Sequence, residues 1–362
     1  NTTLNKNIVR IGWFCIFILN NIFLYSQYSW QDSYAKILPK GDLQWQPKDF
    51  VYTAGGSVRY IDYEGGDDSN TGTSTSAAWK HHPWDNAATG NAIACIGIHT
   101  YIFKRGVIYR GTISARESGT TGNPIRLTSD PSWGSGEAML YGSQRITGGW
   151  IQADSSNAPK IPTPEKVWYI DLSPSMVPTK MVAEIMGDSI VPIPLARTPN
   201  WKIKDTLNPM NEWWKWTGTV GSGTAGGYRI DTLHFKQTDP AYWVGGHVWS
   251  QWNGIMGTVW GEKINSFDTL THSIKTGYNF GGKNCRYYIE NLPQLLDTAN
   301  EFFFDKSGSF PGRLYIRLED GKNPNTTTIE VADKGTLITI WSQQNIEISG
   351  LSFAFTTHDQ IH

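Results

Sequence analysis

The clearest pattern in the sequence is a series of short apolar runs that alternate with polar, glycine-rich turns between His99 and Leu127. The runs are Tyr101–Phe103, Val107–Ile113 and Pro124–Leu127, and the turns between them are Lys104–Gly106 and Glu117–Asn123. Strands this short, joined by turns at such regular intervals, are typical of the successive sides of a coil rather than of a large flat sheet. The pattern therefore predicts a β-solenoid in this part of the chain.

A second alternating pattern covers Gly335–Phe355. Apolar residues recur at every other position in short runs, at Ile338 and Ile340, at Ile346 and Ile348, and at Leu351, Phe353 and Phe355. Asn345 and Gly350 fall between the runs, where a solenoid turns its corners. We interpret this segment as coil again, with parallel strands whose aliphatic side chains stack inward. A plain antiparallel hairpin is the alternative.

The residues ahead of the coil predict a strand, a turn and a cap. Ser57–Tyr63 has the composition of a first strand. In the turn that follows, we expect Asp67, Asp68 and Asn70 to accept hydrogen bonds from backbone N–H groups, because their spacing does not match a calcium-binding loop. Pro83–Ala94 is rich in alanine, which predicts a helix that covers the open end of the solenoid.

The pattern changes after Met139–Trp150, which we expect to be another rung of the coil. The runs Val167–Leu172, Met181–Ile185 and Ile190–Leu195 have the spacing of an antiparallel meander, and Asn211–Trp260 is rich in tryptophan. We therefore expect a cap and first rungs at residues 57–160, a β-rich, tryptophan-containing insert at 165–330, and a resumed coil at 335–362 that stops before it is complete.

The N-terminal residues predict export. Ile11–Tyr25 is an apolar run behind Lys6 and Arg10, and polar residues interrupt it too early for a confident membrane span. We expect residues 1–26 to be a signal peptide and 27–56 an extended leader, so that the protein is secreted, extracellular or periplasmic. A membrane anchor that is not removed is the alternative. Because the chain begins with Asn and ends inside a strand-like pattern, we expect it to be a piece of a longer reading frame.

Composition excludes some partners. The net charge of −1 over 362 residues offers no general attraction to nucleic acid or to an anionic membrane. Cys95 and Cys285 remain after removal of the signal peptide. Export would permit a disulfide between them, whereas lone cysteines so far apart in sequence are more often buried apolar side chains. No Cys/His cluster has the spacing of a zinc site.

The first part of the chain resembles the entry of secreted right-handed parallel β-helix proteins, the pectin-lyase-like group. Two short motifs carry the resemblance: Asp68–Ser69–Asn70 with Gly72–Thr73–Ser74, and Phe103–Lys104 with Gly106, Tyr109, Gly111 and Ile113. His99–Thr100 stands where that group usually has Gly-Asp. The resemblance implies an all-β chain, a right-handed parallel β-helix with a short N-terminal cap helix and a β-rich inserted domain.

Later segments resemble glycoside hydrolases of the same β-helix group. Pro192–Trp201 is similar to their "lARyPN" segment, with Thr198 in place of Tyr. Arg286–Asp305 is similar to their "ieN-l-lLD-pGEWy-D" segment through Glu290, Asn291, Leu295, Leu296, Asp297, Glu301 and Asp305, although Ala299–Asn300 replaces Pro-Gly. The resemblance implies carbohydrate-active chemistry without naming a substrate.

The insert supplies the candidate binding residues. Indole rings stack on the C–H faces of sugars, while arginine and asparagine bind hydroxyl groups. Our candidates for substrate binding are therefore Arg197, Asn200, Trp213, Trp214, Trp216, Trp243, Trp249 and Trp252. We expect that these tryptophans and Trp260 are not all buried, and that some of them form an exposed aromatic cleft next to Arg197. The alternative is that most of these indoles form the core.

Catalytic residues are not evident from the sequence. Glycosidic bond cleavage needs a pair of carboxyl groups or a base, and such groups would sit on rungs beyond His362. His358 and Asp359 are candidates, and solvent-facing turn residues are the alternative. We expect a monomer that acts on a polysaccharide or other glycan, with no cofactor. Calcium enters only if the protein is a lyase.

Three function classes follow. The first is a secreted polysaccharide-degrading enzyme, a glycoside hydrolase ahead of a polysaccharide lyase. The second is a non-catalytic carbohydrate-binding or adhesive protein, and the third is a structural surface solenoid. Paired acidic residues on adjacent rungs would favour hydrolysis, and a Lys/Arg set with calcium ligands would favour a lyase.

Overall fold

The computed structural model describes most of the chain in two compact units, Asn1–Thr53 and Ala54–His362. The described residues are 35–37, 39–40, 43–45, 51–52, 56–176, 179–187, 189–200, 207, 209–221, 228–252, 259–278 and 281–362. In the first unit, strand β1 (Ala35–Ile37) pairs antiparallel with β2 (Leu43–Trp45). The expected signal peptide, residues 1–26, lies outside the described residues. Within the described part of the chain, no helix has the length and hydrophobicity needed to cross a bilayer.

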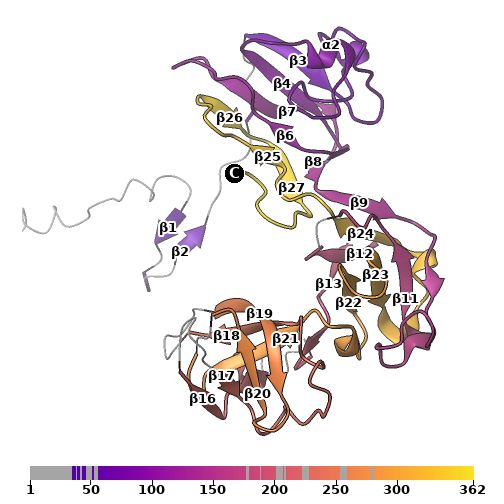
Figure 1. Cartoon of the computed structure of the whole chain (residues 1–362). Helices are drawn as coiled ribbons and strands as arrows, with labels where there is room; N and C mark the ends of the chain where they lie inside the picture. Colours follow the sequence, from indigo (N-terminus) through magenta and orange to yellow (C-terminus); the bar gives the residue numbers. More distant parts are fainter. Residues whose placement is uncertain are drawn as a thin grey trace, which may run out of the picture. The chain divides into compact units, whose positions relative to one another are not determined.

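The second unit begins with parallel sheets, whose early strands are drawn in indigo and purple in Figure 1 and whose C-terminal strands are drawn in yellow. In one sheet, β3 (Ser57–Ile61), β4 (His99–Arg105), β7 (Ile125–Gly134) and β26 (Ile346–Ile348) are neighbours, and each pair is parallel. In a second sheet, β5 (Ile108–Arg110), β8 (Ala138–Tyr141) and β27 (Leu351–Ala354) are parallel. In a third, β6 (Ile113–Ser114) pairs with β25 (Ile338–Thr339), which Ile361 joins through a further parallel bridge.

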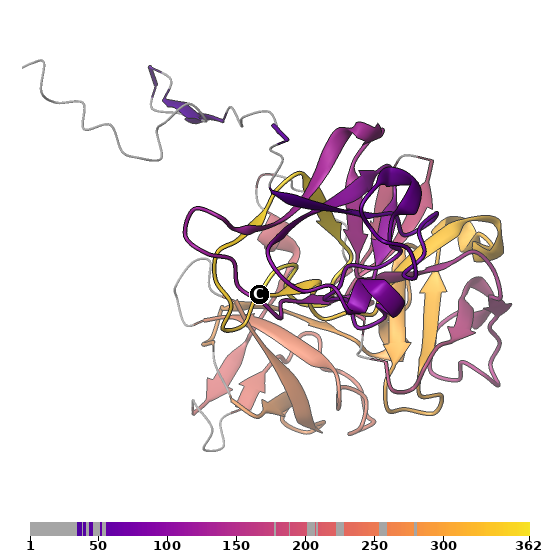
Figure 2. The ribbon, with the colours of Figure 1, turned by 90° about the horizontal axis from the view of Figure 1, so that it is seen from above.

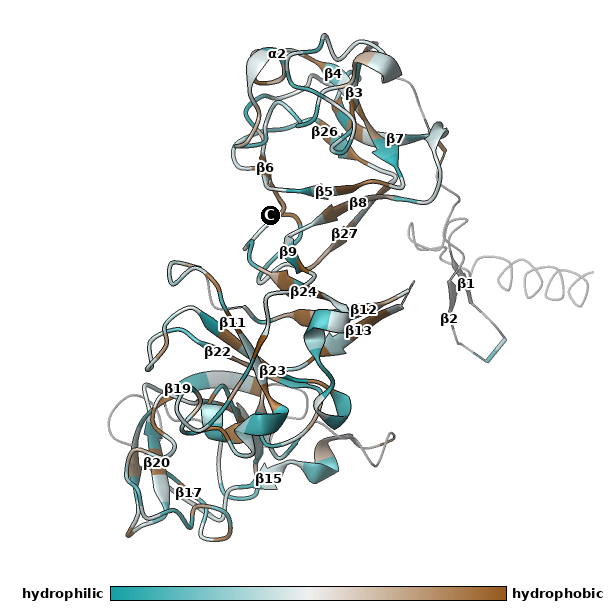
Figure 3. Cartoon of the chain, turned by 90° about the vertical axis from the view of Figure 1, so that its right-hand side faces the viewer, coloured by the Kyte–Doolittle hydropathy of each residue, from teal (hydrophilic) through white to brown (hydrophobic). Residues whose placement is uncertain are grey.

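The parallel pairing of Gly335–Phe355 confirms the prediction made from its alternating pattern. The segment is not a hairpin, because its strands pair with residues more than 200 positions earlier in the sequence. Alternate side chains point inward and stack between turns: Ile346 lies opposite Ile125, and Ile348 opposite Leu127. The predicted corners are also present, since Asn345 has φ 57° and Gly350 has φ 62°. Figure 3 shows the hydrophobic residues along β8 and β27.

The cap differs from its prediction. Only α2 (Gly90–Ile93) is α-helical within the expected Pro83–Ala94, and a 3₁₀ turn precedes it at Thr75–Ala77. In the rest of the segment, aspartate side chains accept hydrogen bonds from backbone N–H groups: Ala87 N donates to Asp85, and Thr89 N donates to Asp68. The segment nevertheless covers the first rung, because its Trp84, Ala88 and Ala92 side chains pack with Ile61 and Phe103 in one buried core. Figure 2, the view from above, shows this segment at the front.

An antiparallel excursion interrupts the parallel sheets, and it begins at Ser143 rather than at residue 165. β9 (Ser143–Ile146) pairs antiparallel with β24 (Thr328–Ala332), so the expected rung at Met139–Trp150 supplies only β8 to the parallel sheet. The chain returns where Asp333 N and Lys334 N both donate to Gly142 O. The alternation of β9 resembles that of a rung strand, which is why the sequence pattern does not mark the boundary.

Two packed sheets form the outer part of the excursion. One has the order β13 (Ser189–Ile193), β12 (Val182–Met186), β24, β9; the other has β10 (Ile151–Gln152), β11 (Trp168–Asp171), β23 (Arg313–Arg317), β22 (Glu301–Asp305). Short 3₁₀ turns at Glu319–Gly321 and Pro324–Thr326 lie between β23 and β24 and so connect the two sheets, and a third, Pro164–Lys166, lies between β10 and β11. Their shared core includes Val182, Phe302, Leu314, Ile329 and Val331. We call this part the sandwich. The expected meander is only partly present, because β11 pairs with β23 and not with β12.

The residues between β13 and β22 in the sequence form a further antiparallel sheet, which we call the inner sheet because of this place in the chain. Its strands run in the order β14 (Arg197–Thr198), β21 (Arg286–Glu290), β18 (His247–Gln251), β19 (Val259–Asp268), β20 (Ser273–Thr276), β17 (Tyr228–Ile230), β16 (Gly218–Val220), with β15 (Trp214–Lys215) also on β21. Turns of 3₁₀ type lie at Pro209–Glu212 and Pro293–Leu295. The described residues therefore form an all-β protein.

Candidate functional site

The tryptophans of the inner sheet divide into buried and exposed groups. Trp216 and Trp243 are core residues, 1 % and 2 % exposed, and the Trp216 indole stacks on the Tyr287 ring with centroids 3.5 Å apart. Trp214 packs against the same core and stacks on His234. These three candidates have structural neighbours on their ring faces, so the structure places them in packing positions. The remaining tryptophans lie outside this core.

Arg197 is the buried centre of a polar and aromatic cluster whose other members are partly exposed. Its guanidinium carbon lies 3.8 Å from the centroid of the Tyr288 ring and 5.8 Å from that of Trp213. Its Nε donates to Pro199 O, and the residue is 4 % exposed. Strand pairing places Glu290 directly opposite Arg197. We name Arg197, Trp213, Trp249, Tyr288 and Glu290 the arginine cluster.

Glu290 accepts a hydrogen bond from the Trp249 indole, with Nε1 2.7 Å from Oε1. Burial raises the pKa of Glu290, although the Trp249 hydrogen bond and the charges of Arg197 and Lys180 oppose the rise. Gly261 makes room for this arrangement, since a Cβ there would lie 2.5 Å from His247 Nε2 and 2.9 Å from the Trp249 ring. Several strands thus supply the side chains of the cluster. Because Arg197 is buried, it is better placed to stabilise the sheet than to contact a ligand.

The other sequence candidates lie in separate places. Asn200 forms a side-chain hydrogen bond with Asp297. His358 and Asp359 contact each other, Nδ1 to Oδ2 3.2 Å, with side chains 70 % and 49 % exposed, and His362 Nδ1 lies 3.5 Å from the same carboxylate oxygen. These residues follow β27 at the surface of the parallel sheets, far in sequence from the arginine cluster.

An exposed aromatic surface lies at one edge of the inner sheet, where β18 and β20 end and β19 begins. It consists of Trp260, which is 51 % exposed, Tyr278, which is 38 % exposed, and Trp252, which is partly exposed. The rings of Trp252 and Tyr278 are near parallel with centroids 6.0 Å apart, and Trp260 stands edge-on to Trp252 at 6.3 Å. Trp260 Nε1 lies 3.2 Å from Glu262 Oε1, so a carboxylate borders the surface. Some tryptophans of the insert are thus exposed, but Trp252 follows the last residue of β18, whereas Arg197 lies opposite Glu290, which pairs with the first residue of β18, His247. The aromatic surface is therefore not the cleft expected next to Arg197.

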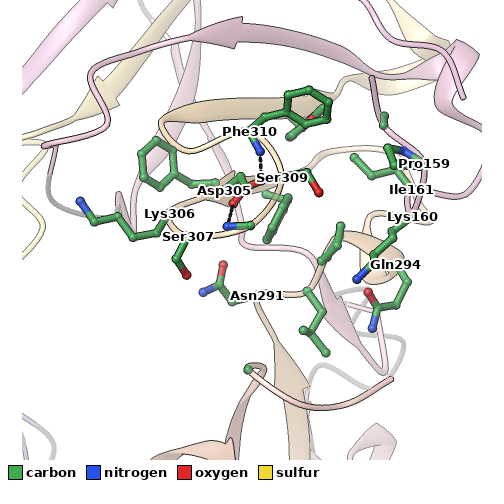
Figure 4. A pocket seen from close by; sticks show the side chains of 18 of the residues that line it. Pro159, Lys160, Ile161, Asn291, Gln294, Asp305, Lys306, Ser307, Ser309 and Phe310 are labelled. Carbon is green, nitrogen blue, oxygen red and sulfur yellow. Dashed lines mark hydrogen bonds between the residues drawn. The ribbon is translucent and has the colours of Figure 1, made fainter. Parts of the chain in front are cut away.

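A pocket of about 450 Å³ lies among segments of the sandwich and the inner sheet (Figure 4). Its polar lining includes Lys160, Asn291, Gln294, Ser307 and Ser309. Phe303, Phe310, Tyr242, Ile161 and Leu292 supply apolar walls. The volume falls within the range of about 300–1,000 Å³ that is typical of small-molecule sites.

We searched the described residues for side chains that could bind a metal ion. No group of three or more His, Cys, Asp or Glu side chains there is arranged to hold a metal ion. As expected for a turn and not for a calcium-binding loop, Asp68 accepts hydrogen bonds from the backbone N–H groups of Lys80, His81 and Thr89. Cys95 and Cys285 are free thiols in the structure, and Cys285 is buried.

Sequence reasoning missed the pocket and two aromatic contacts. Tyr278 and Tyr288 were not candidates, because the aromatic candidates of the insert were chosen by its richness in tryptophan. The pocket draws on segments near residues 160, 242, 292 and 307, which no local pattern links. One signal was available: Asp305 followed by Gly308 is a turn motif in a loop between two apolar strands.

Comparison with known proteins finds similarity in structure and not in sequence. No family model matches the chain, and no curated protein matches it. A solved chain described as "Glycoside hydrolase" is 16 % identical with a TM-score of 0.56, over 83 % of this chain and 51 % of that one. Another, described as "The complex structure of XylC with xylose", is 11 % identical with a TM-score of 0.36, over 83 % and 36 %. This chain thus spans about half the length of the solved glycoside hydrolase chain. At this identity the likeness to that glycoside hydrolase is one of fold.

Proposed function

We propose that this chain belongs to a secreted, polysaccharide-active protein whose parallel sheets are turns of a right-handed parallel β-helix, and that the protein hydrolyses glycosidic bonds. The inner sheet supplies a surface that holds the glycan. The expected signal peptide at residues 1–26 supports export. The structural likeness to a glycoside hydrolase over 83 % of the chain supports the choice of hydrolysis.

The observation that carries the proposal is the exposed aromatic surface of Trp252, Trp260 and Tyr278. Large aromatic side chains usually gain stability by burial, and a group of two exposed rings and one partly exposed ring therefore indicates a binding role. Aromatic faces attract the apolar C–H faces of sugar rings, and the Glu262 carboxylate beside Trp260 is an acceptor for sugar hydroxyl groups. A balanced net charge of −1 is compatible with a glycan partner.

The test is to measure the retention of the 362-residue chain in native gels that contain single polysaccharides, neutral and acidic, followed by product analysis. Retention by at least one polysaccharide supports the glycan-binding part. New reducing ends without unsaturated products support hydrolysis, and unsaturated products favour the polysaccharide lyase. Retention without products favours the non-catalytic binding protein. Absence of retention by every polysaccharide would contradict the proposal.

A further inference from the structure

The pocket beside the Asp305–Phe310 loop is built from fixed parts. Both carboxylate oxygens of Asp305 accept backbone hydrogen bonds, from Gly308 N at 2.5 Å and from Phe310 N at 2.9 Å. Gly308 is required there, because a Cβ would lie 2.7 Å from Asp305 Oδ1. The Arg313 guanidinium lies 4.2 Å from the centroid of the Phe310 ring. A loop held in this way presents its Ser307 and Ser309 hydroxyls with little further loss of conformational entropy on binding.

The charges around the pocket cancel. Lys160 and Lys306 are balanced by Asp239 and Asp305. Lys306 Nζ donates to Pro174 O and Met176 O, each at 2.8 Å, and Asp239 accepts from Ala241 N. Three of these charged groups are thus engaged with the backbone. An ionised ligand would find no net opposite charge, so the lining suits a neutral ligand that carries many hydroxyl groups.

The remaining lining pairs hydrogen-bonding groups with apolar walls. Figure 4 shows Lys160 and Gln294 at one side of the pocket, Asn291 and Ser307 in its lower part, and Phe310 above. The Gln294 side chain is held by Tyr242, to whose carbonyl oxygen its Nε2 donates. Sugar rings have the matching character, with hydroxyl groups at their edges and C–H groups on their faces. A cavity of about 450 Å³ has room for a ligand of mono- or disaccharide size.

We propose that this pocket binds a neutral sugar unit, such as the end of a neutral oligosaccharide, and that it is a second glycan site separate from the aromatic surface. The inference rests on the proposed function and narrows it to neutral glycans. Lys160 and the Ser307 and Ser309 hydroxyls bind the sugar hydroxyls, and the ring of Phe310 packs on a sugar face.

The test is isothermal titration calorimetry of the 362-residue chain with neutral disaccharides (xylobiose, cellobiose, mannobiose) and with digalacturonate. At least one neutral disaccharide is expected to bind at millimolar or lower concentration, and digalacturonate at least about tenfold more weakly. Lys160→Met and Ser309→Ala are each expected to weaken binding about three- to tenfold, the loss of one hydrogen bond. Lys166→Met, which removes an exposed lysine outside the pocket, should leave binding unchanged.

The outcomes separate the two glycan sites. Trp260→Ala should weaken retention by polysaccharide and leave disaccharide binding intact. Three results would each overturn the pocket proposal and leave the proposed function standing. The first is retention by polysaccharide without binding of any neutral disaccharide, and the second is equal or tighter binding of digalacturonate. The third is disaccharide binding that Lys160→Met and Ser309→Ala do not change. Absence of both retention and disaccharide binding would remove the proposed function as well. Unchanged urea midpoints for the variants ensure that a loss of binding is not a loss of folding.

Discussion

Arg110 and Glu330 lie 220 residues apart in the sequence and form a bidentate ion pair, with Nη1 3.0 Å from Oε2 and Nη2 2.8 Å from Oε1. Glu330 is fully buried and also accepts from Ser143 Oγ and Arg145 Nε. Arg110 belongs to the parallel sheet, whereas the other residues belong to the strands that leave it and return to it. One carboxylate therefore links the excursion to β5, the neighbour of the strand β8 from which the excursion departs.

Replacing Glu330 with Gln should destabilise the protein by about 3 kcal/mol or more, because it leaves the charges of Arg110 and Arg145 without their buried partner. Urea unfolding followed by tryptophan fluorescence measures the change. Glu347→Gln is the matched control, since its ion pair with Arg126 is partly exposed and should contribute about 0–1 kcal/mol. Equal losses for the two variants would show that Glu330 is no more important than a surface ion pair.

The contribution of Glu330 should depend on pH. Burial by itself raises the pKa of Glu330, but hydrogen bonds from Arg110, Ser143 and Arg145 outweigh it and lower the pKa below its ordinary value of 4.5. A carboxyl group with a lowered pKa in the folded state stabilises that state fully above its unfolded pKa, and this stabilisation is lost as the pH falls through the folded pKa. The difference in unfolding free energy between wild type and Glu330→Gln should therefore be constant near neutral pH and shrink below about pH 4.5. A difference that grows on acidification would contradict the assignment.

Gly261→Ala should disturb the arginine cluster, because the added methyl group collides with the rings of His247 and Trp249. We expect a loss of about 1–3 kcal/mol in unfolding free energy and weakening of the Trp249–Glu290 hydrogen bond. Gly335→Ala serves as the control, since a Cβ at that position meets nothing within 4 Å and should change stability by about 0.5 kcal/mol or less. Thermal unfolding of the two variants side by side provides the comparison.

Much of the parallel arrangement was predictable, because the alternation at Ile338, Ile346 and Leu351 depends only on which side chains face inward. The start of the excursion was not, since Ser143–Ile146 alternates in the same way and its antiparallel partner lies almost 190 residues later. The arginine cluster was partly predictable: Arg197, Trp213 and Trp249 were among the candidates, but the pairing of Arg197 with Glu290 depends on strand register. The pocket could not be predicted, because its walls come from distant segments.

Asp68 explains why the cap is a series of turns rather than the predicted helix. The carboxylate of Asp68 is buried and accepts hydrogen bonds from Lys80 N, His81 N and Thr89 N. Asp68→Ala would leave these donors without their acceptor, and we expect a loss of about 2–3 kcal/mol and faster hydrogen exchange at the three amides. The neighbouring Asp67→Ala removes an exposed carboxylate that bonds only locally to Ser69, and it should leave the urea midpoint nearly unchanged. Comparable losses in both would show that the turn depends on neither side chain in particular.

The central claim is that the aromatic surface of Trp252, Trp260 and Tyr278 holds a glycan. The most direct measurement is affinity electrophoresis of wild type, Trp252→Ala and Trp260→Ala in gels that contain the polysaccharide retained best by wild type, with Trp133→Ala as a control. Trp133 is a partly exposed tryptophan of the parallel sheet whose ring contacts Tyr60. We predict that each of the two variants lowers the affinity about fivefold or more, as expected for losing roughly 1 kcal/mol or more of aromatic contact, while Trp133→Ala is retained like wild type. Equal retention of all four proteins, or failure of wild type to be retained by any polysaccharide, would contradict the account.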